Sequence, residues 1–191
     1  GVAGACGLAL AAVAGWWLVG VGLGCVAAAW LYTGGPRPYG YLGLGELSVF
    51  TFFGLVATVG AAYVQTERLT GLEVLAALPV GLLAVALLVV NNLRDIPGDA
   101  AAGKRTLAVR LGPGGARALY GSCIGGAFAL VAPVAVVRLW ALLALAALAV
   151  AVVPVRRVTS GVEGPALVPV LGATGRLQLA FGLLMAVGLA L

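Results

Sequence analysis

The stretch that decides the fold runs from Glu73 to Asp99 and reads EVLAALPVGLLAVALLVVNNLRDIPGD. Residues 74–93 carry no charge, and such a run is close to the ~20 apolar residues that cross the hydrocarbon core of a bilayer. Polar and charged side chains begin at Asn91 and continue to the end of the stretch. The pattern therefore predicts a membrane-spanning helix that carries a polar site at one end.

The rest of the chain has the same character. It is 63% hydrophobic and only 9% charged, with a mean hydropathy of +1.16. Soluble domains are usually about 45–50% apolar. Further uncharged runs cover 1–36, 47–66, 118–137, 139–155 and 177–191. Since backbone polar groups in lipid must be satisfied within each segment, we expect an all-α, polytopic transmembrane helical bundle.

Seven apolar segments are expected, and the loops between them should alternate between the two sides of the membrane. The segments are about 1–14, 16–32, 46–65, 73–92, 115–137, 139–155 and 174–191. Loops 33–45, 93–114 and 156–173 then share one side and, with their flanks, hold nine of the 11 basic residues. By the positive-inside rule this side is predicted to be cytoplasmic. The net charge of +5 is thus explained by loop topology, and no nucleic-acid partner is expected.

Histidine is absent from the chain. This excludes a histidine-based triad, a zinc–histidine site and an imidazole base in this stretch. Chemistry here has to use carboxylates, tyrosines and cations.

Asn91, Asp95 and Asp99 are spaced by four residues, so a continuous helix would place them along one face. Pro97 interrupts that pattern, because proline lacks a backbone N–H and disfavours helix at the preceding residue. We therefore expect the helix to end or kink between the two aspartates.

The aspartates and the cations around them suggest a metal and phosphate site. Mg²⁺ typically uses one or two carboxylates and takes its other ligands from water and substrate phosphates. Arg94, Lys104 and Arg105 could bind a diphosphate. The alternative is an ordinary solvated loop, whose ion pairs would each contribute about 0–1 kcal/mol.

A second polar loop, from Tyr32 to Glu46, favours a binding site over an ordinary solvated loop. It gathers aromatic, basic and acidic residues on the same predicted side, and the candidates for substrate binding in it are Tyr32, Arg37, Tyr39 and Glu46. Two such loops on one face indicate a binding site better than either does alone.

The run from Asn91 to Gly112 closely resembles the second aspartate-rich motif of the UbiA-type intramembrane prenyltransferases. Together with the YTGGPRPYGY loop at 32–41, its wording is most similar to the branch of that family whose acceptor is 1,4-dihydroxy-2-naphthoate, in menaquinone biosynthesis. The resemblance implies transfer of a polyprenyl group from polyprenyl diphosphate to the naphthoate ring, with loss of carbon dioxide and diphosphate, giving demethylmenaquinone.

The same resemblance assigns roles to residues. Asp95 and Asp99 would bind Mg²⁺ and diphosphate, Asn91 would support them, and Lys104 and Arg105 would contact phosphate. The family also carries a Tyr-x-x-x-Lys element where Tyr32 falls. Position 36 is proline here, and Arg37 is its candidate substitute.

Members of the family have nine transmembrane helices, so the seven segments would correspond to the last seven of one membrane-embedded domain over residues 1–191. The first aspartate-rich motif has no match here and would lie before Gly1. The chain as given is therefore expected to lack half of the metal site and to be inactive by itself.

Three other interpretations remain open. A relative with the same fold could use another acceptor, such as 4-hydroxybenzoate. A membrane transporter is a different class, but ionisable residues within the spans would mark its path, whereas the charges here cluster in loops. The chain could also be a non-catalytic scaffold.

Overall fold

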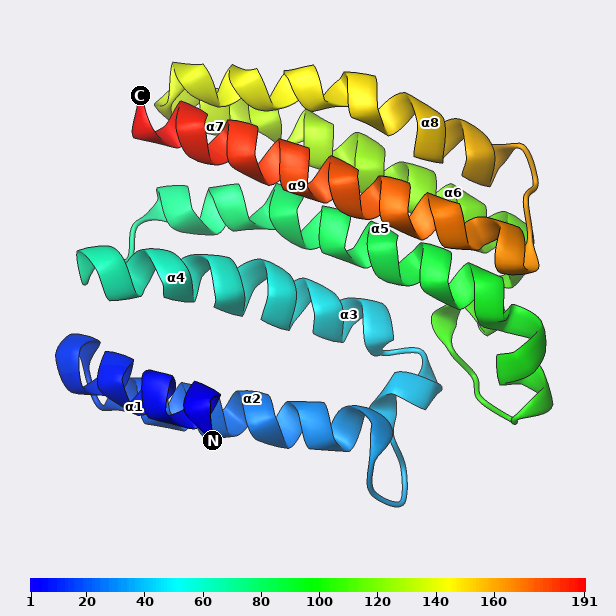
Figure 1. The fold of residues 1–191 in the computed structure, drawn as a ribbon, viewed down its shortest axis with the longest axis horizontal. Coiled ribbons are helices and arrows are strands. Elements are labelled where there is room, and N and C mark those ends of the chain that lie inside the picture. Colours follow the sequence, from blue (N-terminus) through cyan, green and yellow to red (C-terminus); the bar gives the residue numbers. More distant parts are fainter.

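A computed structural model describes residues 1–191 as helices joined by short turns, without a strand (Figure 1). In chain order the elements are α1 (Val2–Ala14), α2 (Trp17–Thr33), η1 (Tyr39–Leu42), α3 (Gly45–Val49), the π-helix η2 (Phe50–Val56), α4 (Ala57–Thr66), α5 (Gly71–Ala101), α6 (Leu107–Ala129), α7 (Val131–Val137), the 3₁₀ helix η3 (Leu139–Ala147), α8 (Leu148–Thr159), η4 (Gly164–Leu167) and α9 (Val168–Ala190).

Consecutive elements join into seven rods, which confirms the all-α fold and the seven predicted segments. Five of the rods are long and apolar enough to cross a membrane, whereas α1 and α2 are apolar but shorter. The five are Gly45–Thr66, Gly71–Ala101, Leu107–Val137, Leu139–Thr159 and Gly164–Ala190. The chain is thus a multi-pass membrane protein by the length and composition of its helices.

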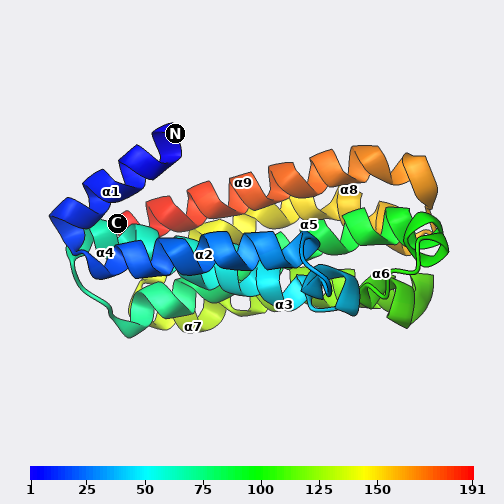
Figure 2. The same cartoon turned by 90° about the horizontal axis from the view of Figure 1, so that it is seen from below.

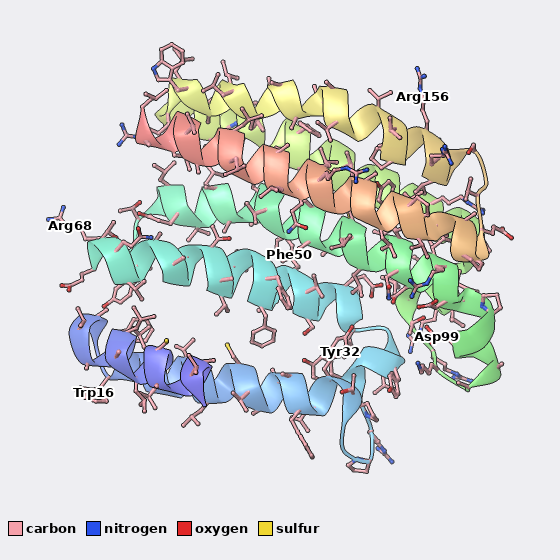
Figure 3. All side chains as sticks on the ribbon, viewed as in Figure 1. Trp16, Tyr32, Phe50, Arg68, Asp99 and Arg156 are labelled. Atoms are coloured by element: carbon pink, nitrogen blue, oxygen red, sulfur yellow. The ribbon has the colours of Figure 1, made fainter.

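The rods lie side by side and alternate in direction (Figure 1), and only α1 diverges from the common axis (Figure 2). The turns after α2, α5 and α8 therefore share one end of the bundle. Figure 3 shows Tyr32, Asp99 and Arg156 toward this end and Trp16 and Arg68 at the opposite one. The predicted grouping of the polar loops on one side of the bundle is confirmed.

The core is formed mainly by α5, α6, α7, η3, α8 and α9. Within it, α5 packs chiefly on α6, and α9 chiefly on η3. The hydroxyl groups of Tyr120 and Thr174 are hydrogen-bonded at 2.9 Å, and both residues are fully buried. About two helical turns further along both helices, the rings of Phe128 and Phe181 meet edge to face with centroids 5.4 Å apart. These contacts hold α6 against α9 and leave the polar end of α5 at the rim of the core.

The π-helix η2 packs closely on α5. A Cβ built on Gly54 would lie 2.5 Å from the Cα of Gly81, so only glycine allows the two backbones to approach this far. A π-helix has a wider turn than an α-helix and often occurs at functional sites. Here it turns Phe52 and Phe53 toward the cavities described below.

The helix does not end between Asp95 and Asp99, as one of the two expected outcomes had it, because α5 continues through Pro97 to Ala101. The helix ends instead at Gly103, whose φ of +72° is the left-handed conformation that glycine tolerates. The N–H of Gly103 donates to the carbonyl of Ala100 at 3.1 Å, and that of Lys104 donates to the carbonyl of Asp99 at 2.9 Å. These two bonds form a Schellman motif.

The polar segment expected at 93–114 is consequently mostly helical. Only residues 102–106 separate α5 from α6, and Thr106 caps α6 by accepting a hydrogen bond from the N–H of Val109 at 3.4 Å. The break in this region is at Gly112, where φ is +68° just before Pro113. The loop expected at 156–173 is likewise shortened, because η4 and α9 together begin at Gly164.

Candidate active site

Asp99 and Lys104 form an ion pair at the end of α5. Nζ of Lys104 donates to Oδ1 of Asp99 at 2.8 Å, and the aspartate side chain is only 12% exposed. The Asp99 carboxylate raises the pKa of Lys104 above its ordinary value, with smaller contributions from neighbouring groups. Lys104 therefore remains a cation throughout the physiological pH range.

Asp95 lies one turn earlier on α5 and is paired with its neighbour in sequence. The Arg94 guanidinium donates from Nε to Oδ1 at 2.7 Å and from Nη2 to Oδ2 at 2.6 Å. Both side chains are partly open to solvent, since 28% of Arg94 and 39% of Asp95 are exposed. The end of α5 thus presents two carboxylates and two cations that a diphosphate could contact.

The two polar loops dock on each other. Nζ of Lys104 lies 4.8 Å from the centre of the Tyr41 ring, within the range of a cation–π contact. The N–H of Arg105 donates to the carbonyl of Tyr41 at 2.9 Å, and Nε of Arg110 donates to the carbonyl of Arg105 at 3.1 Å. This docking confirms that the loop after α2 and the loop after α5 form one face.

Tyr32, in the last turn of α2, contacts Tyr39 at the start of η1. Their rings meet edge to face with centroids 5.5 Å apart. The Tyr39 hydroxyl donates to the carbonyl of Ala28 at 2.8 Å and is hydrogen-bonded to Ser48 at 3.1 Å. Its polar atom is therefore used to join α2 to α3. The Tyr32 hydroxyl has no hydrogen bond within the protein, and its ring lines a cavity.

Glu46 lies in the first turn of α3 and is only 7% exposed. Oε1 accepts a hydrogen bond from Nδ2 of Asn92 at 3.0 Å, whereas Oε2 is buried and has no partner. A buried carboxylate oxygen without a donor is costly, and a ligand hydroxyl group would relieve that cost.

Two apolar cavities lie between the helices on this side of the core. The first, of about 460 Å³, is bounded by η2, α5 and α9, and Asn91 is one of its few polar groups. The second, of about 490 Å³, lies between α2 and η2 and includes Tyr32. Val49 and Phe53 line both, so the two cavities share one wall. Both volumes are typical of sites for small organic ligands.

Two predicted residues are not gathered into this cluster. Arg37 is exposed in the turn after α2, and its side chain makes neither a hydrogen bond nor an ion pair. The Arg105 side chain is also exposed, and only its backbone takes part in the docking of the loops. The other eight predicted residues lie on the two segments that dock on each other. Asn91, Arg94, Asp95 and Asp99 are on the last turns of α5 and Lys104 follows them, whereas Tyr32, Tyr39 and Glu46 are on α2, η1 and α3.

Two residues of the site were missed by the sequence analysis. Asn92 holds the buried Glu46 carboxylate, and Tyr41 receives the ammonium group of Lys104. The Asn91-Asn92 pair at the end of an uncharged run was a usable signal for Asn92, because an unpaired amide is costly in such a position. Tyr41 belongs to the YTGGPRPYGY loop at 32–41, but no sequence pattern distinguishes it from the other tyrosines of that loop.

The donor set at the end of α5 suits Mg²⁺ in part. Asp95 and Asp99 offer hard carboxylate oxygens one turn apart. Both oxygens of Asp95 accept hydrogen bonds from Arg94, whereas Oδ2 of Asp99 accepts none from the protein. No point in the structure is surrounded by three or more His, Cys, Asp or Glu side chains. Residues 1–191 therefore supply two carboxylates, and the remaining ligands would have to come from water, substrate or elsewhere.

Comparison with known proteins shows the family to which the chain belongs. The chain belongs to the UbiA prenyltransferase family, whose model matches residues 1–166. Among the similar proteins are the 1,4-dihydroxy-2-naphthoate octaprenyltransferases of Mycobacterium tuberculosis, 45% identical over 184 residues, and of Mycobacterium leprae, 43% identical over 185 residues. The Escherichia coli protein of that name is 40% identical over 194 residues.

These alignments cover 96%, 97% and 96% of this chain, in the order given, but only 63%, 63% and 62% of the relatives. The chain thus spans less than two thirds of the length of the curated relatives that it matches.

Proposed function

We propose that this chain forms the diphosphate-binding and acceptor-binding wall of a prenyltransferase active site. The proposed reaction transfers a polyprenyl group from polyprenyl diphosphate to 1,4-dihydroxy-2-naphthoate, with loss of carbon dioxide and diphosphate. The observation that carries the proposal is the docking of Lys104 on Tyr41 and Asp99, beside an apolar cavity that reaches Asn91. The printed names of the relatives support the choice of acceptor.

The apolar cavity bounded by η2, α5 and α9 is suited to the first isoprene units of the donor. Six of its eight lining residues are hydrophobic, among them Leu87, Leu88 and Leu171. Moving a prenyl tail out of water contributes about 0.8 kcal/mol for each buried CH₂ group. Its volume of about 460 Å³ holds only part of a long polyprenyl chain, so the remainder would lie along the helices in lipid.

The charged end of α5 is suited to the diphosphate head. Arg94 and Lys104 are already held in place by Asp95 and Asp99, so they need little reordering when a phosphate group arrives. The C–O bond of the allylic diphosphate breaks with its electron pair on oxygen. Cations beside that oxygen stabilise the departing charge, and the allylic carbon becomes electrophilic.

Mg²⁺ is the proposed cofactor, and Asp95 and Asp99 would be its ligands from this chain. When bound, it would neutralise negative charge on the diphosphate and so favour its departure. Asn91, one turn before Asp95, would orient the aspartate or a phosphate oxygen by hydrogen bonding.

The naphthoate ring is proposed to lie near Glu46 and Tyr32. A hydroxyl group of the acceptor would donate to the unpartnered Oε2 of Glu46, which increases the electron density of the ring. The ring then supplies the electron pair of the new C–C bond. Its carboxylate leaves as carbon dioxide and returns an electron pair to the ring, so the product is the hydroquinone form of demethylmenaquinone. No protein nucleophile is needed.

The location proposed for the protein is the cell membrane, with the site facing the cytoplasm. The end of the bundle that carries the site also carries most of the basic residues, as the positive-inside rule requires of a cytoplasmic face.

The test is prenyl transfer by membranes that contain the full chain as its gene encodes it. Labelled polyprenyl diphosphate is offered with 1,4-dihydroxy-2-naphthoate or with 4-hydroxybenzoate. We expect label in a decarboxylated naphthoquinol and release of carbon dioxide. Preferential labelling of 4-hydroxybenzoate would overturn the acceptor, and the absence of label in any acceptor would overturn the reaction.

A further inference from the structure

A small cavity between α8 and α9 holds two arginine side chains and lies apart from the candidate active site. Its volume is about 130 Å³, and Arg157 and Arg176 line it together with Pro154, Pro169 and Val170. It lies near the end of the bundle where α8 ends and α9 begins, which is the end that also carries Asp99 (Figures 1 and 3).

Neither arginine has an acidic partner in the protein. The three ion pairs of the structure are Arg94–Asp95, Lys104–Asp99 and Arg117–Glu163. The acid nearest to Arg157 in the sequence, Glu163, is thus already paired at 2.9 Å. Two like charges that share one cavity repel each other, and an anion between them would offset this repulsion.

Arg176 also lies within a membrane-spanning rod, Gly164–Ala190, where an unpaired charge is costly. Its side chain runs back toward the start of α9, because a Cβ built on Gly172 would be 3.9 Å from Nη1 of Arg176. Such a course brings the guanidinium toward the end of the bundle where Arg157 lies in the last turn of α8. Long basic side chains near helix ends reach the headgroup region in this way.

The cavity does not belong to the prenyl-transfer site. Gln178 lines the first apolar cavity, and Arg176 is two residues earlier on the same helix. Two residues correspond to about 200° of rotation around the helix axis, so Arg176 lies on the opposite face of α9 from Gln178. A volume of about 130 Å³ is also well below the roughly 300–1,000 Å³ of pockets that enclose whole organic ligands. It suits a single small charged group.

We propose that Arg157 and Arg176 bind the phosphate group of an anionic membrane phospholipid. Guanidinium groups bind phosphate oxygens in a bidentate manner, and basic pockets between transmembrane helices are known sites for acidic headgroups. The surrounding surface fits the rest of the lipid, because Val153 on α8 is 58% exposed and Leu179 on α9 is 63% exposed. The acyl chains would lie along these side chains.

The experiment is native mass spectrometry of the purified full chain in detergent, titrated with phosphatidylglycerol, phosphatidylcholine or inorganic phosphate. We expect one phosphatidylglycerol to bind more tightly than phosphatidylcholine. Arg157→Ala or Arg176→Ala should each weaken that binding about tenfold or more, because a hydrogen bond to a charged group is worth about 1.5–3 kcal/mol.

Arg156→Ala is the matched control, because it removes the same charge from the same helix at a residue that does not line the cavity. We expect it to change the affinity by less than about threefold, as for a diffuse surface charge. Arg157→Lys with Arg176→Lys keeps the charge but loses the bidentate geometry, and it should show an intermediate loss.

Three results would overturn the proposal. An Arg156→Ala variant that loses as much affinity as Arg157→Ala would show a general surface charge. Displacement of the lipid by an equal concentration of inorganic phosphate would show a site for a soluble anion. Full retention of phosphatidylglycerol by the doubly alanine-substituted variant would show that the cavity does not bind the headgroup.

Discussion

Nζ of Lys104 lies 2.8 Å from Oδ1 of Asp99, five residues earlier in the chain. The Schellman motif at Gly103 brings these two positions together, since the N–H of Lys104 also donates to the carbonyl of Asp99. The same ammonium group lies 4.8 Å from the Tyr41 ring centre. One lysine therefore joins the end of α5 to the loop that follows α2.

Replacing Lys104 with methionine should impair prenyl transfer without unfolding the bundle. Methionine keeps the apolar stem but removes the charge that contacts diphosphate, so kcat/KM should fall by about 10- to 100-fold, the equivalent of one charge-assisted hydrogen bond. Steady-state rates with labelled polyprenyl diphosphate measure this. Lys104→Arg is the control, and it should retain more activity than Lys104→Met.

Tyr41→Leu should raise KM for the diphosphate donor several-fold. The substitution removes a cation–π contact worth about 0.5–2 kcal/mol and so loosens Lys104. Tyr41→Phe retains the ring and should behave like the wild type. An equal rise of the donor KM in both variants would show that the hydroxyl group, and not the ring, is what matters. An unchanged donor KM in both would show that neither group contributes.

Glu46→Gln should selectively weaken binding of the aromatic acceptor. Glutamine can still accept the hydrogen bond from Asn92 at Oε1, but it replaces the free carboxylate oxygen with an amide donor. We expect the acceptor KM to rise about tenfold or more while the donor KM stays unchanged. Parallel titrations of both substrates measure it. A parallel rise of both KM values would point to a general distortion of α3.

Gly103→Ala should destabilise the protein. The φ of +72° at this position costs a residue with a Cβ about 1–2 kcal/mol, so thermal unfolding in detergent should begin at a lower temperature. Gly98→Ala is the matched control, because Gly98 lies within α5 and a Cβ there would meet no atom within 4 Å. The control should keep or raise the unfolding temperature.

The transmembrane segments could be predicted because long uncharged runs leave few alternatives in lipid. The residue at which α5 ends could not be predicted, because Pro97 and Gly103 both signal the end of a helix and lie only six residues apart. The structure ends the helix at Gly103, where the left-handed backbone closes two hydrogen bonds, and accommodates Pro97 with the loss of one. Intramembrane helices tolerate such a loss more readily than sequence rules for soluble helices suggest.

The candidate site was predictable as a pairing of two loops but not in its internal contacts. Charge and aromatic content placed Tyr32, Glu46, Asp95 and Asp99 on one side of the membrane. That Glu46 meets Asn92, 46 residues away, depends on how α3 packs on α5. The exposed position of Arg37 depends on the course of a glycine- and proline-rich turn. No local pattern fixes either of these.

The most direct test of the proposed active site is the initial rate of labelled naphthoquinol formation by the Asp95→Asn, Asp99→Asn double variant of the full chain. Asparagine preserves size and removes both negative charges, so the proposed metal and diphosphate site would be disabled. We expect the rate to fall by at least about 10²- to 10³-fold relative to wild-type protein of equal amount and unfolding temperature. A rate within about threefold of the wild type would contradict the assignment of these aspartates to catalysis.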